Sequence, residues 1–316
     1  MKGKALFTLV FLVLGCKPAT RITVETLKEN QPLIETEALI KELASDAFNG
    51  RKSGHPDFEL AMNYTEAYFK KEGVKPYFAD SYRDTFLIKG KSTANIVAFI
   101  GDKTKDKKYV LIGAHLDHLG PSPSRTDTVY NGANDNASGV TAVLQMSKEL
   151  NKYKFDYNII IALFGAEEAG LAGSKHLAKR LKQERIDLAY MLNFEMLGKT
   201  LTSGTDEVYM TGFNKSDCAA KMNEIAGKEF VKFLPVASTY GLFRRSDNYA
   251  FYKEFNIPSH TFSTFDFENY KYYHEEGDEV SELDLENMNT IIHSATYVII
   301  KMLQSKIEPT LAVSQK

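Results

Sequence analysis

Several residue types are scarce in this chain of 316 residues. Tryptophan is absent, and Cys16 and Cys218 are the only cysteines. Two cysteines provide no disulfide framework, so an apolar core must hold the fold, and 20 Phe and 17 Tyr supply aromatic bulk for it. Basic residues are not in excess either: 39 Lys and Arg stand against 41 Asp and Glu, for a formal net charge of −2. With no basic cluster, a nucleic-acid partner is not expected.

An apolar stretch of ten residues, 5–14, lies near the N-terminus behind Lys2 and Lys4. Ten residues are too few to span a bilayer as a helix, and a basic start before a short apolar stretch is typical of a signal peptide. The stretch ends in VLGC, which resembles a bacterial lipobox. We therefore predict that residues 1–15 are removed. Cys16 would become a lipidated N-terminus that anchors the protein in the bacterial cell envelope, on the periplasmic side or at the outer membrane. The alternative is an ordinary signal peptide with an incidental cysteine.

The rest of the chain reads as a polar tether over 16–34, one domain over 35–306 and a polar tail over 307–316. Helical periodicity and apolar runs alternate along that domain. Predicted helices cover 35–48, 57–72, 136–150, 172–183, 215–227, 246–254 and 283–304, and predicted strands cover 93–100, 108–114, 158–164, 188–194 and 259–263. Apolar strands separated by helices indicate an α/β fold of three layers, with a largely parallel central sheet covered by helices on both faces. Cys218 falls in a predicted amphipathic helix, which favours a buried structural thiol.

Histidines and carboxylates follow the ends of these strands. His115 comes after the strand ending at 114, the pair Glu167–Glu168 after 164, and Glu195 after 194, while His274 lies in the loop beyond 263. Ligands collect at the carboxyl edge of a parallel sheet, so these side chains are expected to meet there. Zinc binds N and O ligands, and a hydrolytic zinc site also needs a carboxylate base, so an adjacent Glu pair can supply one ligand and one base.

Two aspartates complete this pattern. Asp117, two residues beyond His115, could accept the second imidazole N–H and fix its tautomer. Asp135 lies in the Gly- and Asn-rich turn NGANDN, where its two oxygens could bind two metals about 3.5–4 Å apart. Taken singly, a histidine beside a strand is usually just a polar residue at the strand end, and an aspartate in such a turn is usually a turn residue or the N-cap of a helix. Together, the residues favour a metallohydrolase.

The chain resembles the co-catalytic di-zinc aminopeptidases of peptidase family 28, relatives of glutamate carboxypeptidase and glutaminyl cyclase. The resemblance covers about residues 40–305 and rests on six motifs in the family's order and spacing. These are AHLDHLG, NGANDNASGV, FGAEEAGLAGS, NFEMLG, RRSDNYAFY and YYHEEGDE. It implies a zinc-exopeptidase catalytic domain of the phosphorylase/hydrolase-like fold, with a mixed sheet, that removes N-terminal residues from peptide substrates.

The resemblance also assigns roles, and it implies two Zn²⁺ per chain. His115 and Glu195 would hold one zinc, Glu168 and His274 the other, and Asp135 would bridge them. Asp117 would orient His115, and Glu167 would be the general base toward a metal-bound hydroxide. A cis peptide bond between Asp135 and Asn136 is implied as well.

Two positions depart from the family pattern. Many relatives carry Asp where this chain has Glu195, and His where it has Asn248; the second difference is expected to affect the substrate cleft.

Tyr273 is a candidate donor to the oxyanion of the reaction, with packing as the alternative. Arg245 is a candidate contact for a substrate carboxylate, with a solvated pair formed with Arg244 as the alternative. His118 is expected to be structural rather than a ligand.

Other functions fit the same scaffold. A glutaminyl cyclase would work with one zinc, whereas the pairing of His115 with Glu195 favours two. A carboxypeptidase or dipeptidase would share the metals and differ in its specificity pocket. A non-catalytic binding module, as in transferrin receptor, would be expected to have lost ligands. Aromatic loops at 240–243 and 262–273 favour bulky neutral side chains in the substrate pocket.

Overall fold

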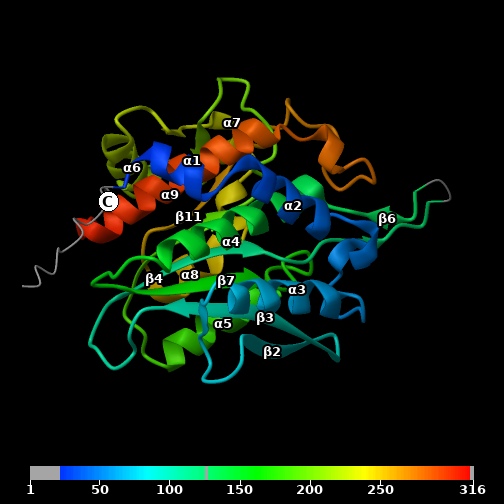
Figure 1. Ribbon diagram of the computed structural model, residues 1–316, viewed down its shortest axis with the longest axis horizontal. Coiled ribbons are helices and arrows are strands. Elements are labelled where there is room, and N and C mark those ends of the chain that lie inside the picture. The colour runs from blue at the N-terminus through cyan, green and yellow to red at the C-terminus, as the bar shows by residue number, and fades with distance from the viewer. Residues whose placement is uncertain (1–21, 125–126, 314–316) are drawn as a thin grey trace, which may run out of the picture.

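The computed structural model describes residues 22–124 and 127–313 (Figure 1). The predicted signal peptide, 1–15, and the predicted lipidation site, Cys16, lie outside the described residues. The predicted tether and tail are described only in part.

A nine-stranded mixed sheet forms the centre of the molecule. Its middle strands, in spatial order, are β3 (Lys91–Ile100), β7 (Asn158–Phe164), β4 (Tyr109–His115), β8 (Leu188–Phe194) and β11 (Ser259–Ser263). Four of them, β7, β4, β8 and β11, run parallel to one another. On one side of these four strands, β3 pairs antiparallel with β7, and it also pairs antiparallel with β1 (Lys75–Pro76) and β2 (Arg83–Ile88). On the other side, β11 pairs antiparallel with β9 (Val208–Met210). At the far edge β10 (Val231–Lys232) lies parallel to β9.

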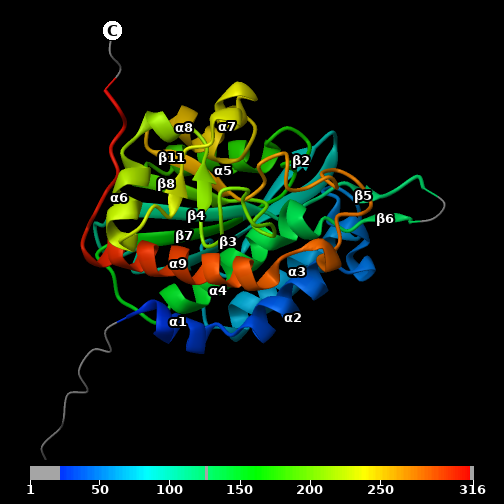
Figure 2. The ribbon, with the colours of Figure 1, turned by 90° about the horizontal axis from the view of Figure 1, so that it is seen from above.

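Helices cover both faces of the sheet, as the sequence predicts (Figure 2). One layer contains α1 (Val24–Asn30), α2 (Leu33–Leu43), α3 (Phe58–Lys71), α4 (Gly139–Leu150), α6 (Cys218–Ala226) and α9 (Leu285–Gln304). The opposite layer contains α5 (Ala172–Gln183) and α8 (Asn248–Phe255), with the short α7 (Pro235–Thr239) nearby. Side chains alternate along β7, so that Ile159 and Ile161 face the first layer while Ile160 and Ala162 face the second. The fold is therefore the predicted three-layer α/β arrangement.

The predicted elements are observed, some with the predicted ends and others with shifted ends. The helix predicted over 136–150 starts only at Gly139, because a distorted turn, Ala133–Ser138, precedes it and contains a cis peptide bond between Asp135 and Asn136. That bond agrees with the family resemblance. A hairpin of β5 (Gly120–Pro121) and β6 (Val129–Tyr130), not predicted from the sequence, projects from one end of the molecule (Figure 2).

The predicted tether is too long. Residues 24–30 form α1, whose first turn is capped by the Thr23 hydroxyl, which accepts a hydrogen bond from the Thr26 N–H at 3.2 Å. Ile22 and Leu27 are buried in the main core, and α1 packs against α9. Two apolar residues therefore fix a segment whose average composition is polar.

The described part of the predicted tail, 307–313, is likewise held on the surface. The Thr310 N–H donates to Asp217 Oδ1 at 2.6 Å, and Leu311 forms a bridge with Ser216. Cys218 is buried, as predicted. Within the part of the chain that the structure describes, every helix is too short or too polar to cross a bilayer.

Candidate metal centre

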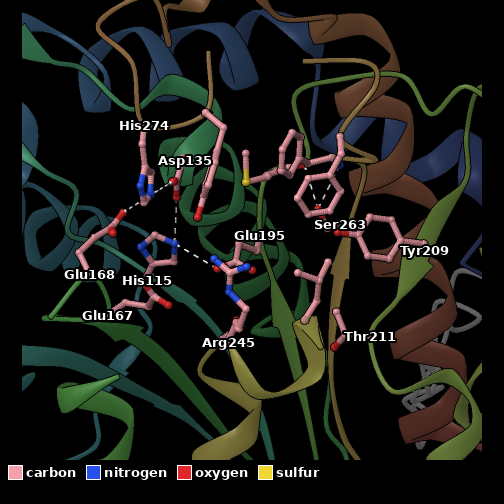
Figure 3. Close-up of a pocket in the computed structure, with 16 residues that line it drawn as sticks. His115, Asp135, Glu167, Glu168, Glu195, Tyr209, Thr211, Arg245, Ser263 and His274 are labelled. Carbon is pink, nitrogen blue, oxygen red and sulfur yellow. Dashed lines mark hydrogen bonds and ion pairs between the residues drawn. The ribbon is translucent and has the colours of Figure 1, made fainter. Parts of the chain in front are cut away.

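Five predicted ligands meet at the carboxyl edge of the sheet (Figure 3). His115 is the last residue of β4, Glu168 follows β7 and Glu195 follows β8. Asp135 comes from the distorted turn before α4, and His274 comes from the loop between β11 and α9. Five separate segments thus deliver the side chains that the sequence pattern placed together.

The five side chains form two half-sites that share Asp135. In the first, His115 Nε2 lies 3.2 Å from Asp135 Oδ1 and 3.3 Å from Glu195 Oε1. In the second, His274 Nε2 lies 3.2 Å from Asp135 Oδ2 and 3.3 Å from Glu168 Oε1. Each oxygen of Asp135 therefore faces a different half-site, which is the arrangement of a bridging carboxylate.

The donor set fits zinc. Donor atoms that share a tetrahedral zinc ion, at about 2.0–2.2 Å from each donor, lie roughly 3.3–3.6 Å apart. The separations of 3.2–3.3 Å between each histidine nitrogen and its two carboxylate oxygens are close to that range. Imidazole nitrogens and carboxylate oxygens are the ligand types that zinc accepts, and a cluster of carboxylates around two imidazoles needs cations to balance its charge.

Asp135 is held by a buried carboxylate that the sequence reasoning missed. Asp278 Oδ2 accepts a hydrogen bond from the Asp135 N–H at 3.0 Å, and Asp278 Oδ1 accepts one from the Asn134 N–H at 2.7 Å. The Tyr270 hydroxyl donates to the same Oδ1 at 2.6 Å. Asp278 lies in the motif YYHEEGDE, four residues after His274, so the loop that carries one ligand also fixes another. The sequence motif contains Asp278 but does not indicate this contact.

Asn136 links the same turn to the first half-site. Its side-chain Nδ2 donates to the Phe194 carbonyl at 3.1 Å, and its Oδ1 accepts from the Met196 N–H at 3.1 Å. These two partners flank Glu195 on either side. The turn that carries Asp135 and the strand end that carries Glu195 are therefore joined directly.

The predicted contact between the Asp117 carboxylate and His115 is wrong. His115 Nδ1 lies 3.0 Å from the backbone carbonyl oxygen of Asp117, two residues further along the chain. The carbonyl can fix the tautomer that leaves Nε2 available for metal. The Asp117 carboxylate instead accepts a hydrogen bond from the Glu167 N–H at 3.0 Å. Asp117 thus positions Glu167.

The electrostatic environment differs sharply among the acids. Burial raises the pKa of Glu167 well above its ordinary value, and the carboxylates of Asp247 and Glu195 raise it further, against the opposing effect of His115. For Asp135, hydrogen bonds with His115 and His274 outweigh burial and hold the pKa well below its usual range. Glu167 is therefore suited to holding a proton, and Asp135 to remaining a carboxylate.

His118 lies behind the second half-site rather than among the predicted ligands. It is fully buried, with Nδ1 at 3.2 Å from Glu168 Oε1 and at 3.9 Å from Asp135 Oδ2. A neutral imidazole protonated at Nδ1 can donate to Glu168 and set the direction of its carboxylate.

Arg51 was also missed, because nothing in its local sequence distinguishes it from a surface arginine. Its side chain is buried, and it donates to the carbonyl oxygens of Leu43, Leu116, Asn131 and Gly132 at 2.6–3.1 Å. Leu116 follows His115 directly, and Gly132 lies at the start of the turn that carries Asp135. Burial lowers the pKa of Arg51 to about 10, against nearby carboxylates that raise it, so the side chain remains a cation beneath the acidic centre.

A cavity of about 110 Å³ opens beside the five predicted ligands. Apolar side chains form part of its wall, namely Met196, Leu242, Phe265 and Phe267. Polar side chains line another part, namely Tyr209, Thr211, Ser246 and Ser263. Glu167 and the two candidate substrate-binding residues, Tyr273 and Arg245, line the same cavity.

Tyr273 and Asn248 occupy different surroundings. The Tyr273 ring stacks on His274, with ring centroids 4.0 Å apart, and on Phe265, at 5.2 Å. Burial raises the pKa of Tyr273, so its hydroxyl stays protonated.

Asn248, expected to affect the cleft, is instead buried outside the cavity lining and donates to the Ser259 carbonyl at 3.1 Å. The structure therefore does not place Asn248 in the lining of the cavity.

Comparisons with known proteins agree with this geometry. The model of the family described as Peptidase family M28 matches residues 95–299. A probable zinc metalloprotease of Pyrenophora tritici-repentis is 32% identical over 124 residues, which cover 39% of this chain and 28% of the relative. Aminopeptidase YwaD of Bacillus subtilis is 27% identical over 219 residues, which cover 67% of this chain and 46% of the relative. The chain thus spans less than half of the length of either relative.

A solved structure extends the likeness to nearly the whole chain. The LapA aminopeptidase of Legionella pneumophila superposes with a TM-score of 0.72 at 20% identity, and the match covers 92% of this chain and 78% of that one. At this identity the likeness establishes the shared fold.

Proposed function

This chain belongs to peptidase family M28, and on that premise we propose that it is a zinc-dependent aminopeptidase that removes N-terminal residues from peptides. The observation that carries the proposal is the position of Asp135, whose two oxygens face two separate half-sites. The names of the relatives, a zinc metalloprotease and an aminopeptidase, support it.

Two zinc ions would be held, one by His115 and Glu195 and one by Glu168 and His274, with one oxygen of Asp135 for each. Bound zinc polarises a substrate carbonyl and lowers the pKa of water. Because Asp135 belongs to both half-sites, its loss should affect both.

Glu167 is the proposed general base and acid. Its carboxylate lines the cavity beside the predicted ligands but makes no ion pair with either ligand histidine within 4.0 Å. The hydrogen bond from its backbone N–H to Asp117 fixes the start of the segment that carries it. In this role the carboxylate takes a proton from the attacking water and gives it to the leaving amine, and its raised pKa favours holding that proton between the two steps.

The acidic side chains that line the cavity support recognition of a free amino group. Glu167, Glu168 and Glu195 all line the cavity, and each can accept a hydrogen bond from an α-ammonium group. An acylated nitrogen carries no charge and offers a single N–H, so N-blocked peptides should bind poorly. The apolar part of the wall, with Phe265 and Phe267, would contact the first side chain.

The test compares leucine p-nitroanilide with its N-acetyl derivative, using zinc-loaded protein and the Glu167→Gln variant as a matched control. Hydrolysis of the free amine alone, lost in the variant, supports the proposal. Cleavage of N-blocked peptides from their C-terminal end would identify a carboxypeptidase instead. Conversion of N-terminal glutamine to pyroglutamate without hydrolysis would identify a cyclase.

A further inference from the structure

Among the described residues, Arg245 is the one arginine that lines the cavity of the candidate metal centre. It directly follows a short 3-10 turn, Leu242–Arg244, and its backbone N–H donates to the Leu242 carbonyl at 2.9 Å. Its side chain is exposed to solvent. Figure 3 shows the side chain extending from the Leu242–Arg244 turn toward the cavity that His115 and Glu195 also line.

The backbone that carries Arg245 is anchored to the central sheet. The hydroxyl of the next residue, Ser246, accepts a hydrogen bond from Asn193 Nδ2 in β8 at 2.9 Å and one from Thr261 Oγ1 in β11 at 3.1 Å. Two residues further on, Asn248 donates to the Ser259 carbonyl at 3.1 Å. These buried contacts hold the start of the Arg245 side chain at a fixed place beside the cavity, as a recognition residue requires.

The charge of Arg245 has no partner in the described parts of the chain, 22–124 and 127–313. Arg83 and Arg180 lie within 2.5–3.2 Å of carboxylates, and Arg51 is surrounded by carbonyl oxygens, whereas no carboxylate of those residues lies within 4.0 Å of Arg245. Apart from the histidines, every other described residue that lines the cavity is acidic or uncharged. The cavity thus contains one permanent cation, whose guanidinium N–H groups have no carboxylate partner among the described residues.

We propose that Arg245 recognises a carboxylate of the substrate, so that the preferred substrates carry both a free amine and a nearby carboxylate. This rests on the proposed aminopeptidase function. A guanidinium binds a carboxylate through two parallel N–H···O bonds, and the apolar side chains of Leu242 and Phe267 line the same cavity. The carboxylate can come from an acidic N-terminal side chain or from the C-terminus of a dipeptide.

Two isosteric substrate pairs separate these sources. Glutamate and glutamine p-nitroanilides differ only at the side-chain carboxylate, and Leu-Gly and Leu-Gly-amide differ only at the C-terminus. The ratio of kcat/KM within each pair is measured for zinc-loaded wild type, for Arg245→Gln and for Arg244→Gln. Arg244 is the matched control, because it is the neighbouring exposed arginine and does not line the cavity.

In the wild type, the member that carries the carboxylate is expected to be preferred at least tenfold in one of the two pairs. Arg245→Gln should reduce that ratio about tenfold or more, and Arg244→Gln should leave it unchanged. The pair that responds names the source of the carboxylate. Ratios near one in the wild type, or ratios that Arg245→Gln does not change, would overturn the proposal.

A measurement of substrate binding distinguishes this inference from the proposed function. Calorimetric titration of the same four compounds into Glu167→Gln, and into the double variant that also carries Arg245→Gln, does not depend on turnover. A carboxylate preference in binding that the second substitution removes supports Arg245 even if the wild type hydrolyses none of the compounds. Equal binding of both members of each pair to Glu167→Gln contradicts it even if hydrolysis is observed.

Discussion

The carboxylate of Asp278 accepts a hydrogen bond from the backbone N–H of Asp135 at 3.0 Å, although 143 residues separate the two in the chain. The neighbouring Asn134 N–H donates to the other oxygen of Asp278 at 2.7 Å. Asp278 therefore fixes the backbone of the turn whose carboxylate is shared by both half-sites.

Asp278→Asn should weaken zinc binding. The asparagine amide presents N–H groups to one of the two backbone donors, so one hydrogen bond becomes a repulsive contact. Loss of contacts that orient a ligand typically costs about 10–100-fold in metal affinity. Competition with a chromophoric chelator measures the change. Tyr270→Phe is the control, because it removes only the hydroxyl that donates to Asp278 Oδ1 and keeps both backbone contacts. Equal zinc affinity of Asp278→Asn and wild type would count against this role.

The shared position of Asp135 predicts an uneven pattern of metal loss. Wild-type protein is expected to hold two zinc ions per chain and to lose activity to chelators. Glu168→Gln and Glu195→Gln should each lose about one ion, whereas Asp135→Asn should weaken both sites. Elemental analysis after gel filtration gives the ratio. The bridging assignment is wrong if Asp135→Asn loses no more metal than the single-site variants do.

Glu167→Gln should retain its zinc and lose turnover. Glutamine has nearly the same shape as glutamate, so the neighbouring ligands stay in place, but it cannot take a proton from water. General acid–base catalysis contributes roughly 10²–10⁴-fold, and kcat should fall by about that factor. Metal content and kcat are measured on one preparation, with Glu168→Gln in parallel. Zinc loss in Glu167→Gln, or turnover close to wild type, would reverse the roles assigned to the adjacent pair.

The residues that could be placed from the sequence are those that follow apolar strands. The predicted strands 158–164 and 188–194 coincide with β7 and β8, and this put Glu168 and Glu195 at one edge of the sheet. Asp135 and His274 lie in a turn and a loop that no periodicity marks; their places beside the sheet edge suggest ligands, and the family resemblance implies the role of each.

The sequence did not reveal which atoms meet. Spacing placed Asp117 near His115, but it could not show that the carbonyl rather than the carboxylate reaches the ring. Arg51 bonds to carbonyls up to 81 residues away, so no local pattern marks it. The tether prediction failed for a related reason, because average polarity concealed the burial of Ile22 and Leu27.

Lipidation of Cys16 remains a proposal from the VLGC segment, and it predicts a location in the cell envelope. Wild-type protein expressed in a bacterial host should fractionate with membranes and carry acyl groups on its N-terminal cysteine. Cys16→Ser should not be processed as a lipoprotein. Cys218→Ser is the control, since it alters the other cysteine and leaves VLGC intact. Recovery of the wild type as soluble protein without acyl groups contradicts the proposal.

His260 should make the folded protein sensitive to acid, independently of the predicted metal ligands. Burial lowers its pKa to about 4, and the neutral ring is held between the Thr211 carbonyl, 2.9 Å from Nδ1, and the Ser216 hydroxyl, 2.7 Å from Nε2. In the unfolded chain the pKa is about 6.5. Above that value both states are neutral and the contribution to the free energy of unfolding is constant. As the pH falls from about 6.5 to about 4, the unfolded state binds a proton that the folded state does not, so stability is lost.

At pH 5 this loss amounts to about 2 kcal/mol for one group. His260→Asn keeps a donor for the Thr211 carbonyl and does not titrate, so its stability should fall less between pH 7.5 and pH 5 than that of wild type, by about 2 kcal/mol. Denaturant unfolding at the two pH values measures the difference. The other titrating groups, including those of the metal centre, are present in both proteins and cancel from the comparison. An equal pH dependence of the free energy of unfolding in the two proteins would contradict the prediction. It would mean that His260 takes up protons equally in the folded and the unfolded states.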